Sequence, residues 1–233
     1  MEMSKFPTQC WQRIEPMLER LRPVAIRPRL LEWGRIHLRS FPWRDTRDSY
    51  RVLIAEVLLH RTRAKQVAPV YENLIQRFPT LETLATAELP ELTELMYSLG
   101  LPWRVPLLLD MAQILEHQGN GVPDNPNVLM QLPGVGPYIA HATVCFAFDK
   151  PEPLLDTNTV RVVSRLTGEP VNDGSRRSRR YRESLETLVK GKEPRLLNFA
   201  LLDFAASVCR AKNPLCRECV LRIYCFYGRT HDD

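Results

Sequence analysis

Four cysteines near the end of the chain are the residues whose type and spacing most clearly indicate chemistry. Their spacing is Cys-x6-Cys-x2-Cys-x5-Cys, at Cys209, Cys216, Cys219 and Cys225. Four thiolates in so short a segment suit a tetrahedral metal ion or a cubane iron–sulfur cluster. Zinc ribbons and fingers usually use two short hooks from separate strands, whereas here one long and one short step surround a single centre. The pattern favours an iron–sulfur cluster, with structural zinc as the competitor and four unrelated buried cysteines as a weaker account.

A glycine-rich turn in the middle of the chain has the form of an anion-binding site. In the segment LPGVGPYIAHA, which begins at Leu132, Gly134 and Gly136 flank Val135 and an apolar helix follows. Glycine lets the backbone approach a ligand closely, and the amides at a helix N-terminus point toward an anion, so a DNA phosphate is a natural occupant. A Gly-x-Gly pair alone is a weak signal, because an ordinary turn between helices also explains it.

Two carboxylates lie in surroundings that suit catalysis. Asp156 stands between an apolar run and a new helix, where it would cap that helix and could also stabilise a cationic sugar transition state or orient a water. Glu56 lies in the apolar segment VLIAEVLLH. It is therefore either buried with a partner such as Arg61 or turned to a cleft as an acid or base, and we favour the cleft.

Helical periodicity dominates the elements that must position these groups. Apolar residues recur at three- and four-residue spacing in segments that begin at residues 32, 50, 64, 83, 104, 138, 181 and 195, and no segment reads as a strand. The sequence therefore predicts an all-α fold. The arginine-rich segment 175–182 either faces a phosphate backbone or is a solvated loop.

The composition is that of a globular protein with a modest positive charge. The 233 residues carry a net charge of +5, which is compatible with a polyanionic partner. There is no apolar run of about 18 residues and no secretion signal at the start. We expect an intracellular monomer, in the cytoplasm or nucleoid, with no membrane contact.

Taken together, these motifs resemble the helix-hairpin-helix (HhH-GPD) DNA glycosylase superfamily, in its iron–sulfur branch with endonuclease III and the adenine glycosylase. The resemblance rests on LPGVGPYIA from Leu132, on Asp156, on the terminal cysteines, and on FPWRDTRDSYRVLIAEVLLHRTRAKQV from Phe41. It covers roughly residues 25–228 and implies two helical domains with a DNA-binding cleft between them. The implied division is an N-terminal extension (1–24), a cluster-containing domain (25–44 and 151–233) and a six-helix barrel with the hairpin (45–150).

The resemblance also implies roles for single residues. Asp156 would be the essential carboxylate, and the four cysteines would hold a 4Fe-4S cluster. His60 and Arg61 would enter the base stack or contact the base left behind when its partner is extruded. The hairpin would grip the backbone of double-stranded DNA beside a mispaired or damaged base through Leu132, Gly134, Val135, Gly136 and Ala140.

Tyr138 bears on the type of reaction. Bifunctional relatives carry a lysine at this position, whose amine attacks the sugar and forms a Schiff base. A phenol there predicts hydrolysis to an abasic site without strand cleavage, and Tyr138 could hydrogen-bond or stack on the flipped base. Lys150 and Lys65 are the alternative amines, although neither lies at the motif position.

Tyr138 and the segments around Phe41 and Glu56 look most like the mismatch-specific thymine glycosylases, which remove thymine or uracil opposite guanine. The nearest rival is an adenine glycosylase acting opposite guanine or 8-oxoguanine. Those enzymes usually carry serine in place of Tyr138 and a further C-terminal domain, whereas this chain continues only briefly after Cys225. From other classes, a non-catalytic helix-hairpin-helix DNA-binding module and a zinc-stabilised helical interaction protein remain alternatives.

Overall fold

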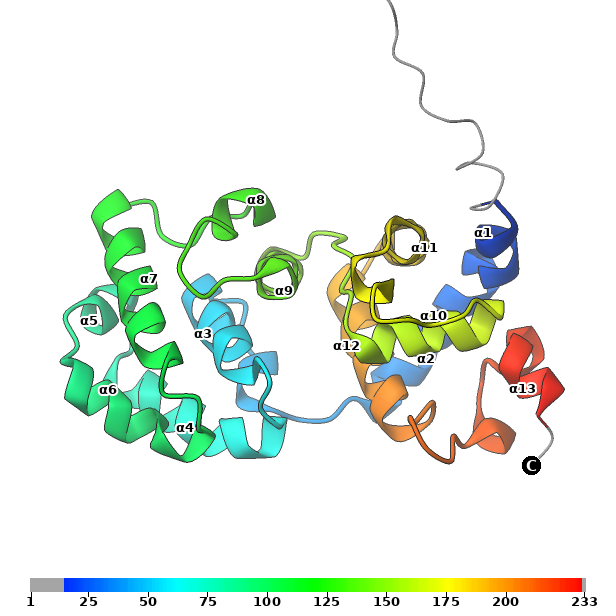
Figure 1. Cartoon of the computed structure of the whole chain (residues 1–233), viewed down its shortest axis with the longest axis horizontal. Coiled ribbons are helices and arrows are strands. Elements are labelled where there is room, and N and C mark those ends of the chain that lie inside the picture. The colour runs from blue at the N-terminus through cyan, green and yellow to red at the C-terminus, as the bar shows by residue number, and fades with distance from the viewer. Residues whose placement is uncertain (1–14, 232–233) are drawn as a thin grey trace, which may run out of the picture. The chain divides into compact units, whose positions relative to one another are not determined.

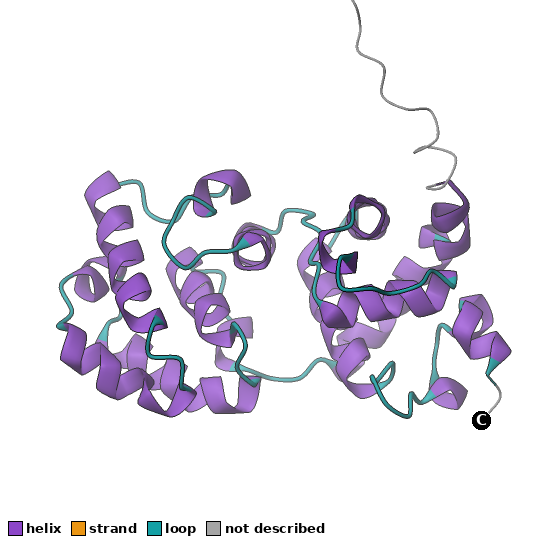
Figure 2. Cartoon of the chain, viewed as in Figure 1, coloured by secondary structure: helices purple, strands orange, loops and turns teal. Residues whose placement is uncertain are grey.

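The structure, a computed structural model, describes residues 15–231. Every regular element within them is an α-helix or a 3-10 helix, and none is a strand (Figure 2). The predicted all-α fold is thereby confirmed. None of the described helices is long and apolar enough to cross a membrane.

The described residues form two compact units (Figure 1). Ser40–Lys150 forms the central unit, and the described residues up to Arg39 and from Pro151 onward form the flanking unit. The first boundary lies before Ser40 rather than after residue 44, because Trp43 is part of the central core: its ring stacks on Phe41 at 5.0 Å and meets Tyr71 edge-on at 5.5 Å.

The central unit consists of helices around one apolar core. Its middle helix, α3, is buried along almost its whole length, which suits a helix that is apolar on every side. Asp48 begins α3 by accepting a hydrogen bond from the backbone N–H of Arg51 at 3.0 Å. The unit's elements are η2 (Pro42–Arg44), α3 (Ser49–Leu59), α4 (Ala64–Arg77), α5 (Leu81–Ala85), α6 (Leu89–Met96), η3 (Tyr97–Leu99), α7 (Arg104–Gln118), α8 (Pro126–Leu129) and α9 (Pro137–Phe148).

The flanking unit combines helices from both ends of the chain. Its elements are α1 (Glu15–Leu21), α2 (Pro23–His37), α10 (Thr157–Thr167), η4 (Ser175–Arg177), α11 (Arg179–Val189), α12 (Pro194–Ser207), η5 (Cys216–Glu218), η6 (Arg222–Tyr224) and α13 (Phe226–Thr230). Helices α2 and α12 approach so closely that a Cβ on Gly34 would lie 2.7 Å from the Cβ of Ala200. Glycine at this position is therefore required by the packing.

The residues before α2 only partly lie within the described chain. Met17 and Leu21 of α1 are buried in the core of the flanking unit, so this part of the segment 1–24 packs on the domain. Trp11 and Ile14 lie outside the described residues. Helix α2 itself begins at Pro23 rather than at residue 32, with proline at its first position and a second proline, Pro28, inside it.

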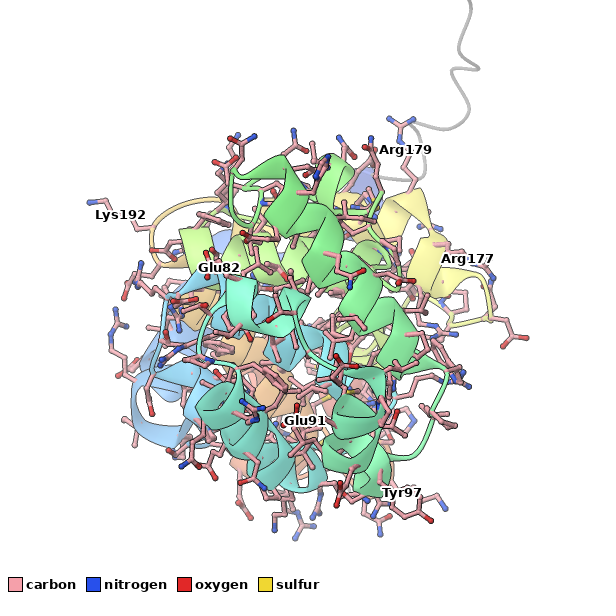
Figure 3. All side chains as sticks on the ribbon, turned by 90° about the vertical axis from the view of Figure 1, so that its left-hand side faces the viewer. Glu82, Glu91, Tyr97, Arg177, Arg179 and Lys192 are labelled. Carbon is pink, nitrogen blue, oxygen red and sulfur yellow. The ribbon has the colours of Figure 1, made fainter. Side chains whose placement is uncertain are left out.

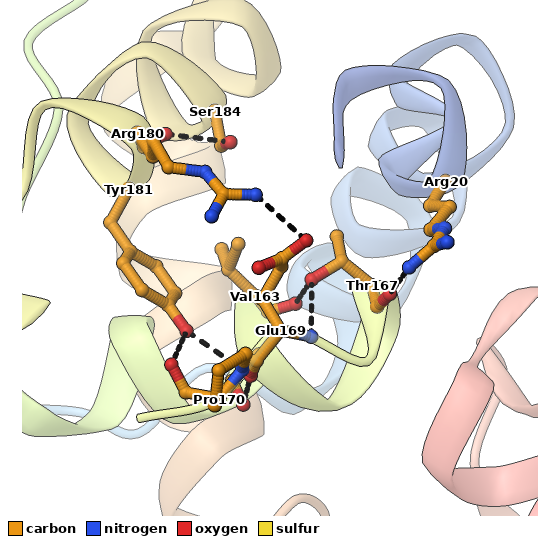
Figure 4. A network of polar contacts seen from close by, with 9 residues as sticks. Arg20, Val163, Thr167, Glu169, Pro170, Arg180, Tyr181 and Ser184 are labelled. Carbon is orange, nitrogen blue, oxygen red and sulfur yellow. Dashed lines mark hydrogen bonds and ion pairs between the residues drawn. The ribbon is translucent and has the colours of Figure 1, made fainter. Parts of the chain in front are cut away.

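A polar network ties the end of α10 to α11 (Figure 4). Arg180 forms an ion pair with Glu169 at 2.8 Å, and the Tyr181 hydroxyl donates to the carbonyls of Glu169 and Pro170. These contacts hold the arginine-rich segment onto the helical core. Arg177 and Arg179 of this segment point away from the ribbon into solvent (Figure 3).

Candidate active site and cysteine cluster

Asp156 lies at the N-cap of α10, in the flanking unit, with its carboxylate held by three N–H donors. One oxygen, Oδ1, accepts from the backbone amides of Asn158 at 2.9 Å and Thr159 at 2.7 Å. The other, Oδ2, accepts from the Asn158 side chain at 2.7 Å. Thr159 Oγ1 in turn accepts from the Asp156 amide, which completes a capping box. The carboxylate is therefore fixed in direction while it stays partly exposed.

Glu56 is buried in α3, in the central unit, and is only 4% exposed. This burial raises the pKa of its carboxyl group to about 8, and the positive charge of Arg44 limits the rise. The charged neighbour is thus Arg44 rather than Arg61. At neutral pH the protonated form predominates, so Glu56 can donate a hydrogen bond or a proton.

His60 and Arg61 form the exposed turn between α3 and α4. Arg61 has a φ of 63°, in the left-handed region that side chains other than glycine rarely adopt. The pKa of His60 is lowered by desolvation and by the charges of Arg104 and Arg61, which favours the neutral imidazole. Both side chains are exposed, as a direct contact with DNA requires.

The glycine turn joins α8 to α9 in the central unit. Gly134 has a φ of 74°, and a Cβ there would lie 3.3 Å from the Cβ of Leu107, so both conformation and space favour glycine. Gly136 is the N-cap of α9 and has no side chain to cap it. Leu132, Val135 and Ala140 are buried, and DNA could reach this turn only through its backbone and its exposed glycines.

Tyr138 lies in the first turn of α9 and is partly buried. Of the two alternative amines, Lys150 Nζ forms an ion pair with Asp124 at 2.6 Å and also donates to the Asp124 carbonyl. Lys65 is exposed on α4. Glu56, Tyr138, the His60–Arg61 turn and the glycine turn all belong to the central unit, whereas Asp156 belongs to the flanking unit.

The four cysteines are reduced and lie in the last segment of the flanking unit. Burial and, to a smaller extent, the charges of the other three cysteines together raise the pKa of Cys219 to about 12, so the four groups share one electrostatic neighbourhood. Arg165 of α10 lies beside them, with Nη1 3.4 Å from Cys209 Sγ. Within residues 15–231 no three His, Cys, Asp or Glu side chains are arranged so that they could hold a metal ion as they stand. Iron–sulfur clusters are held by four cysteine thiolates, so four neighbouring thiols beside cationic side chains have the chemistry that such a cluster needs.

Two residues near the predicted turns were not assigned from the sequence. Trp103 is 47% exposed, whereas Trp43 is in the core. With His60, Gly134 and Arg104, Trp103 lines a pocket beside the glycine turn. Arg104 is buried at the start of α7. The sequence signal that could have identified Arg104 is a charged residue at the start of an otherwise apolar helix.

The comparison with protein families finds a match to residues 54–187, described as HhH-GPD superfamily base excision DNA repair protein. The chain is 37% identical over 218 residues to the thymine-DNA glycosylase of Aeropyrum pernix, covering 90% of this chain and 97% of the relative. It is 35% identical over 191 residues to the thymine/uracil-DNA glycosylase of Methanothermobacter thermautotrophicus, covering 81% and 86%. An adenine DNA glycosylase of Mycobacterium tuberculosis is 33% identical over 195 residues, covering 82% of this chain but 64% of the relative.

Solved structures agree with these matches. A thermostable thymine-DNA glycosylase superposes with a TM-score of 0.84 at 32% identity, covering 90% of this chain and 97% of that one. Endonuclease III in a non-covalent complex with DNA superposes with a TM-score of 0.74 at 26% identity, covering 89% and 97%.

Proposed function

The chain belongs to the HhH-GPD superfamily of base excision DNA repair proteins and is a DNA N-glycosylase, and on this basis we propose that it removes thymine or uracil mispaired with guanine. The observation that carries this proposal is the similarity over nearly the whole chain to thymine and thymine/uracil glycosylases. We further propose that the protein acts as a monomer on double-stranded DNA.

In the proposed reaction, Asp156 stabilises the positive charge that develops on the sugar as the N-glycosidic bond breaks. A water then adds its oxygen to C1′, its proton is released, and the departing base keeps the electron pair of the broken bond. The hydrogen bonds to Asp156 support this role, because they fix both carboxylate oxygens before the substrate arrives.

Glu56 is proposed to act on the leaving base. Its raised pKa keeps a proton on the carboxyl group at neutral pH, and that proton can be hydrogen-bonded to a carbonyl oxygen of thymine or uracil. Withdrawal of electron density from the base would make it a better leaving group. Tyr138, with a phenol and no amine, is proposed to contact the flipped base, so the product is an abasic site in an uncut strand.

DNA is proposed to bind through the two turns of the central unit. The backbone around Gly134 and Gly136 would grip a phosphate, helped by the N-terminal amides of α9. His60 and Arg61 would fill the space that the extruded base leaves in the duplex.

A 4Fe-4S cluster is proposed to be held by Cys209, Cys216, Cys219 and Cys225. When bound, it would supply four iron–thiolate bonds that fix the terminal segment against the rest of its unit. Arg161 and Arg165 of α10 already donate to the Cys209 carbonyl, so α10 connects this segment to Asp156 at its other end.

The test is a set of labelled duplexes with G·T, G·U, G·A, 8-oxoguanine·A or thymine glycol, scored for strand breaks before and after hot alkali. Breaks at T and U that need alkali are expected. Breaks at A would favour the adenine glycosylase instead, and breaks without alkali would contradict the role of Tyr138.

The matched control is Asp156→Asn. Its amide oxygen can still accept both backbone hydrogen bonds, so the helix cap and the affinity for DNA are expected to survive while excision is lost. A wild-type protein that binds DNA but leaves every duplex uncut would favour a non-catalytic DNA-binding module.

A further inference from the structure

Arg104 is a buried cation, 3% exposed, at the start of α7. Nη1 donates to the carbonyls of Leu58 at 3.0 Å and His60 at 2.9 Å, with a longer contact to Val57 at 3.4 Å. Nη2 donates to Thr62 Oγ1 at 3.0 Å and contacts the Gly100 carbonyl at 3.5 Å. All these partners are neutral oxygens, and most belong to the end of α3 and the turn that follows.

The end of α3 is a place where a cation is stabilising. The last carbonyls of a helix have no partners within the helix and carry the negative end of its dipole. Arg104 donates to the Leu58 carbonyl, makes a longer contact to the Val57 carbonyl, and continues to the His60 carbonyl in the turn beyond. One guanidinium group therefore fixes the helix end and the turn together.

The turn needs such a restraint because Arg61 holds a left-handed backbone. That conformation costs a residue with a side chain on the order of 1 kcal/mol and persists only where the surroundings enforce it. Within the turn, the Thr62 amide donates to the Leu59 carbonyl at 3.1 Å, and the His60 amide makes a longer bond, 3.4 Å, to Val57. Arg104 binds the residues on both sides of Arg61, at His60 and Thr62.

We infer that Arg104 is a positioning residue. It holds the His60–Arg61 turn in the conformation in which the turn enters the DNA duplex. This inference rests on the proposed function, because it assumes that the turn replaces an extruded base. Arg104 acts through the turn and touches no reacting atom. Its loss would impair extrusion of a paired base more than cleavage of a base that has no partner.

The experiment compares wild type with Arg104→Met, which keeps much of the side-chain length but has no donors. Hydrogen exchange of the free protein should show faster exchange at the His60 and Thr62 amides. Single-turnover excision of uracil opposite guanine should fall by about 100-fold, the usual cost of a misplaced group. Excision of uracil opposite an abasic site should fall far less, since no base pair has to be opened.

Tyr50→Phe is the matched control for a lost buried hydrogen bond. The Tyr50 hydroxyl donates to the Phe78 carbonyl at 2.7 Å in the same unit, away from the turn. The Tyr50→Phe variant should keep the wild-type ratio between excision of uracil opposite guanine and excision of uracil opposite an abasic site. Arg104→Lys should restore part of the rate opposite guanine, because one ammonium group can still reach a carbonyl. If Arg104→Met does not fold, Thr62→Val removes one of the Arg104 bonds and should shift the ratio in the same direction by a smaller factor.

The outcomes separate the two proposals. A wild-type protein that excises neither uracil nor thymine overturns the proposed function and this inference with it. An active wild type whose Arg104→Met variant loses the same factor on both duplexes, or shows unchanged exchange in the turn, overturns the inference and leaves the proposed function intact.

Discussion

Replacing Glu56 by glutamine tests whether this carboxyl group is protonated inside the folded central unit. Burial raises its pKa from the ordinary 4.5 to about 8, and the positive charge of Arg44 opposes the rise. Between these two values the folded protein binds a proton that the unfolded chain releases. The stabilising contribution of this proton is complete below about pH 4.5 and is lost as the pH rises through 8.

The size of the effect follows from the two pKa values. Within that window the free energy of unfolding should fall by about 1.4 kcal/mol for each pH unit, or about 5 kcal/mol in all. Glutamine has nearly the same shape and does not titrate. Glu56→Gln should therefore lack this loss, and its stability relative to wild type should increase steadily from acid to mildly alkaline pH.

The assay is urea unfolding of both proteins between about pH 5 and pH 8.5. Subtracting the two free energies at each pH cancels the titration of all other groups. Glu72→Gln, an exposed change on the neighbouring helix α4, is the control and should give a flat difference. Parallel curves for wild type and Glu56→Gln would refute the argument, since they would mean that Glu56 has the same pKa folded and unfolded.

Three further changes have definite expected outcomes. Gly134→Ala should lower the free energy of unfolding by about 1–2 kcal/mol and weaken DNA binding in fluorescence anisotropy, because Gly134 has a positive φ and Leu107 lies close to it. Gly136→Ala should lower the free energy of unfolding less, because Gly136 has open space around it and loses only the preference of the N-cap for glycine over alanine. Arg39→Ala should cost about 1–2 kcal/mol in chemical unfolding, because the Asp203 side chain that it binds is 1% exposed, although the Arg39 side chain is half exposed and the residue 39 amide keeps its bond to Asp203. Tyr138→Lys should introduce strand cleavage at abasic sites, trapped as a borohydride-reduced adduct; continued dependence on alkali would contradict the assignment of that position.

Local patterns predict that the chain is helical and predict some of the residues at the helix ends. The apolar spacing of the segment from residue 50 predicts a helix, and α3 spans Ser49–Leu59. The place of Asp156 before a new helix predicts a helix cap, and its side chain accepts hydrogen bonds from the backbone amides of Asn158 and Thr159. Pro28 lies inside α2, where a proline usually argues against a helix, so the sequence predicts a later start than the observed Pro23.

Contacts between residues far apart in the sequence could not be predicted in this way. Arg104 binds carbonyls more than 40 positions earlier in the chain, and a carbonyl oxygen is present at every residue, so no side-chain type marks the partner. The sequence likewise does not identify the charged neighbour of Glu56. Several arginines are close to Glu56 in the sequence, and only the fold shows that Arg44 is the one that acts on it. The exposure of Trp103 could not be predicted from its residue type, because it depends on the place of Trp103 at the start of α7.

Asp156 illustrates why a structural role and a proposed catalytic role need not compete. Capping uses the Asp156 backbone amide and Oδ1, and the cap places the carboxylate where the amides of α10 converge. Oδ2 takes its hydrogen bond from the Asn158 side chain alone, so it is the oxygen better placed to face a developing cation. Because asparagine preserves the capping oxygen and removes the charge, the two roles respond differently to one substitution. If Asp156→Asn keeps the stability of the protein and loses excision, the capping depends on Oδ1 and the chemistry depends on the negative charge. If the variant loses stability, the helix cap itself depends on the ionised carboxylate.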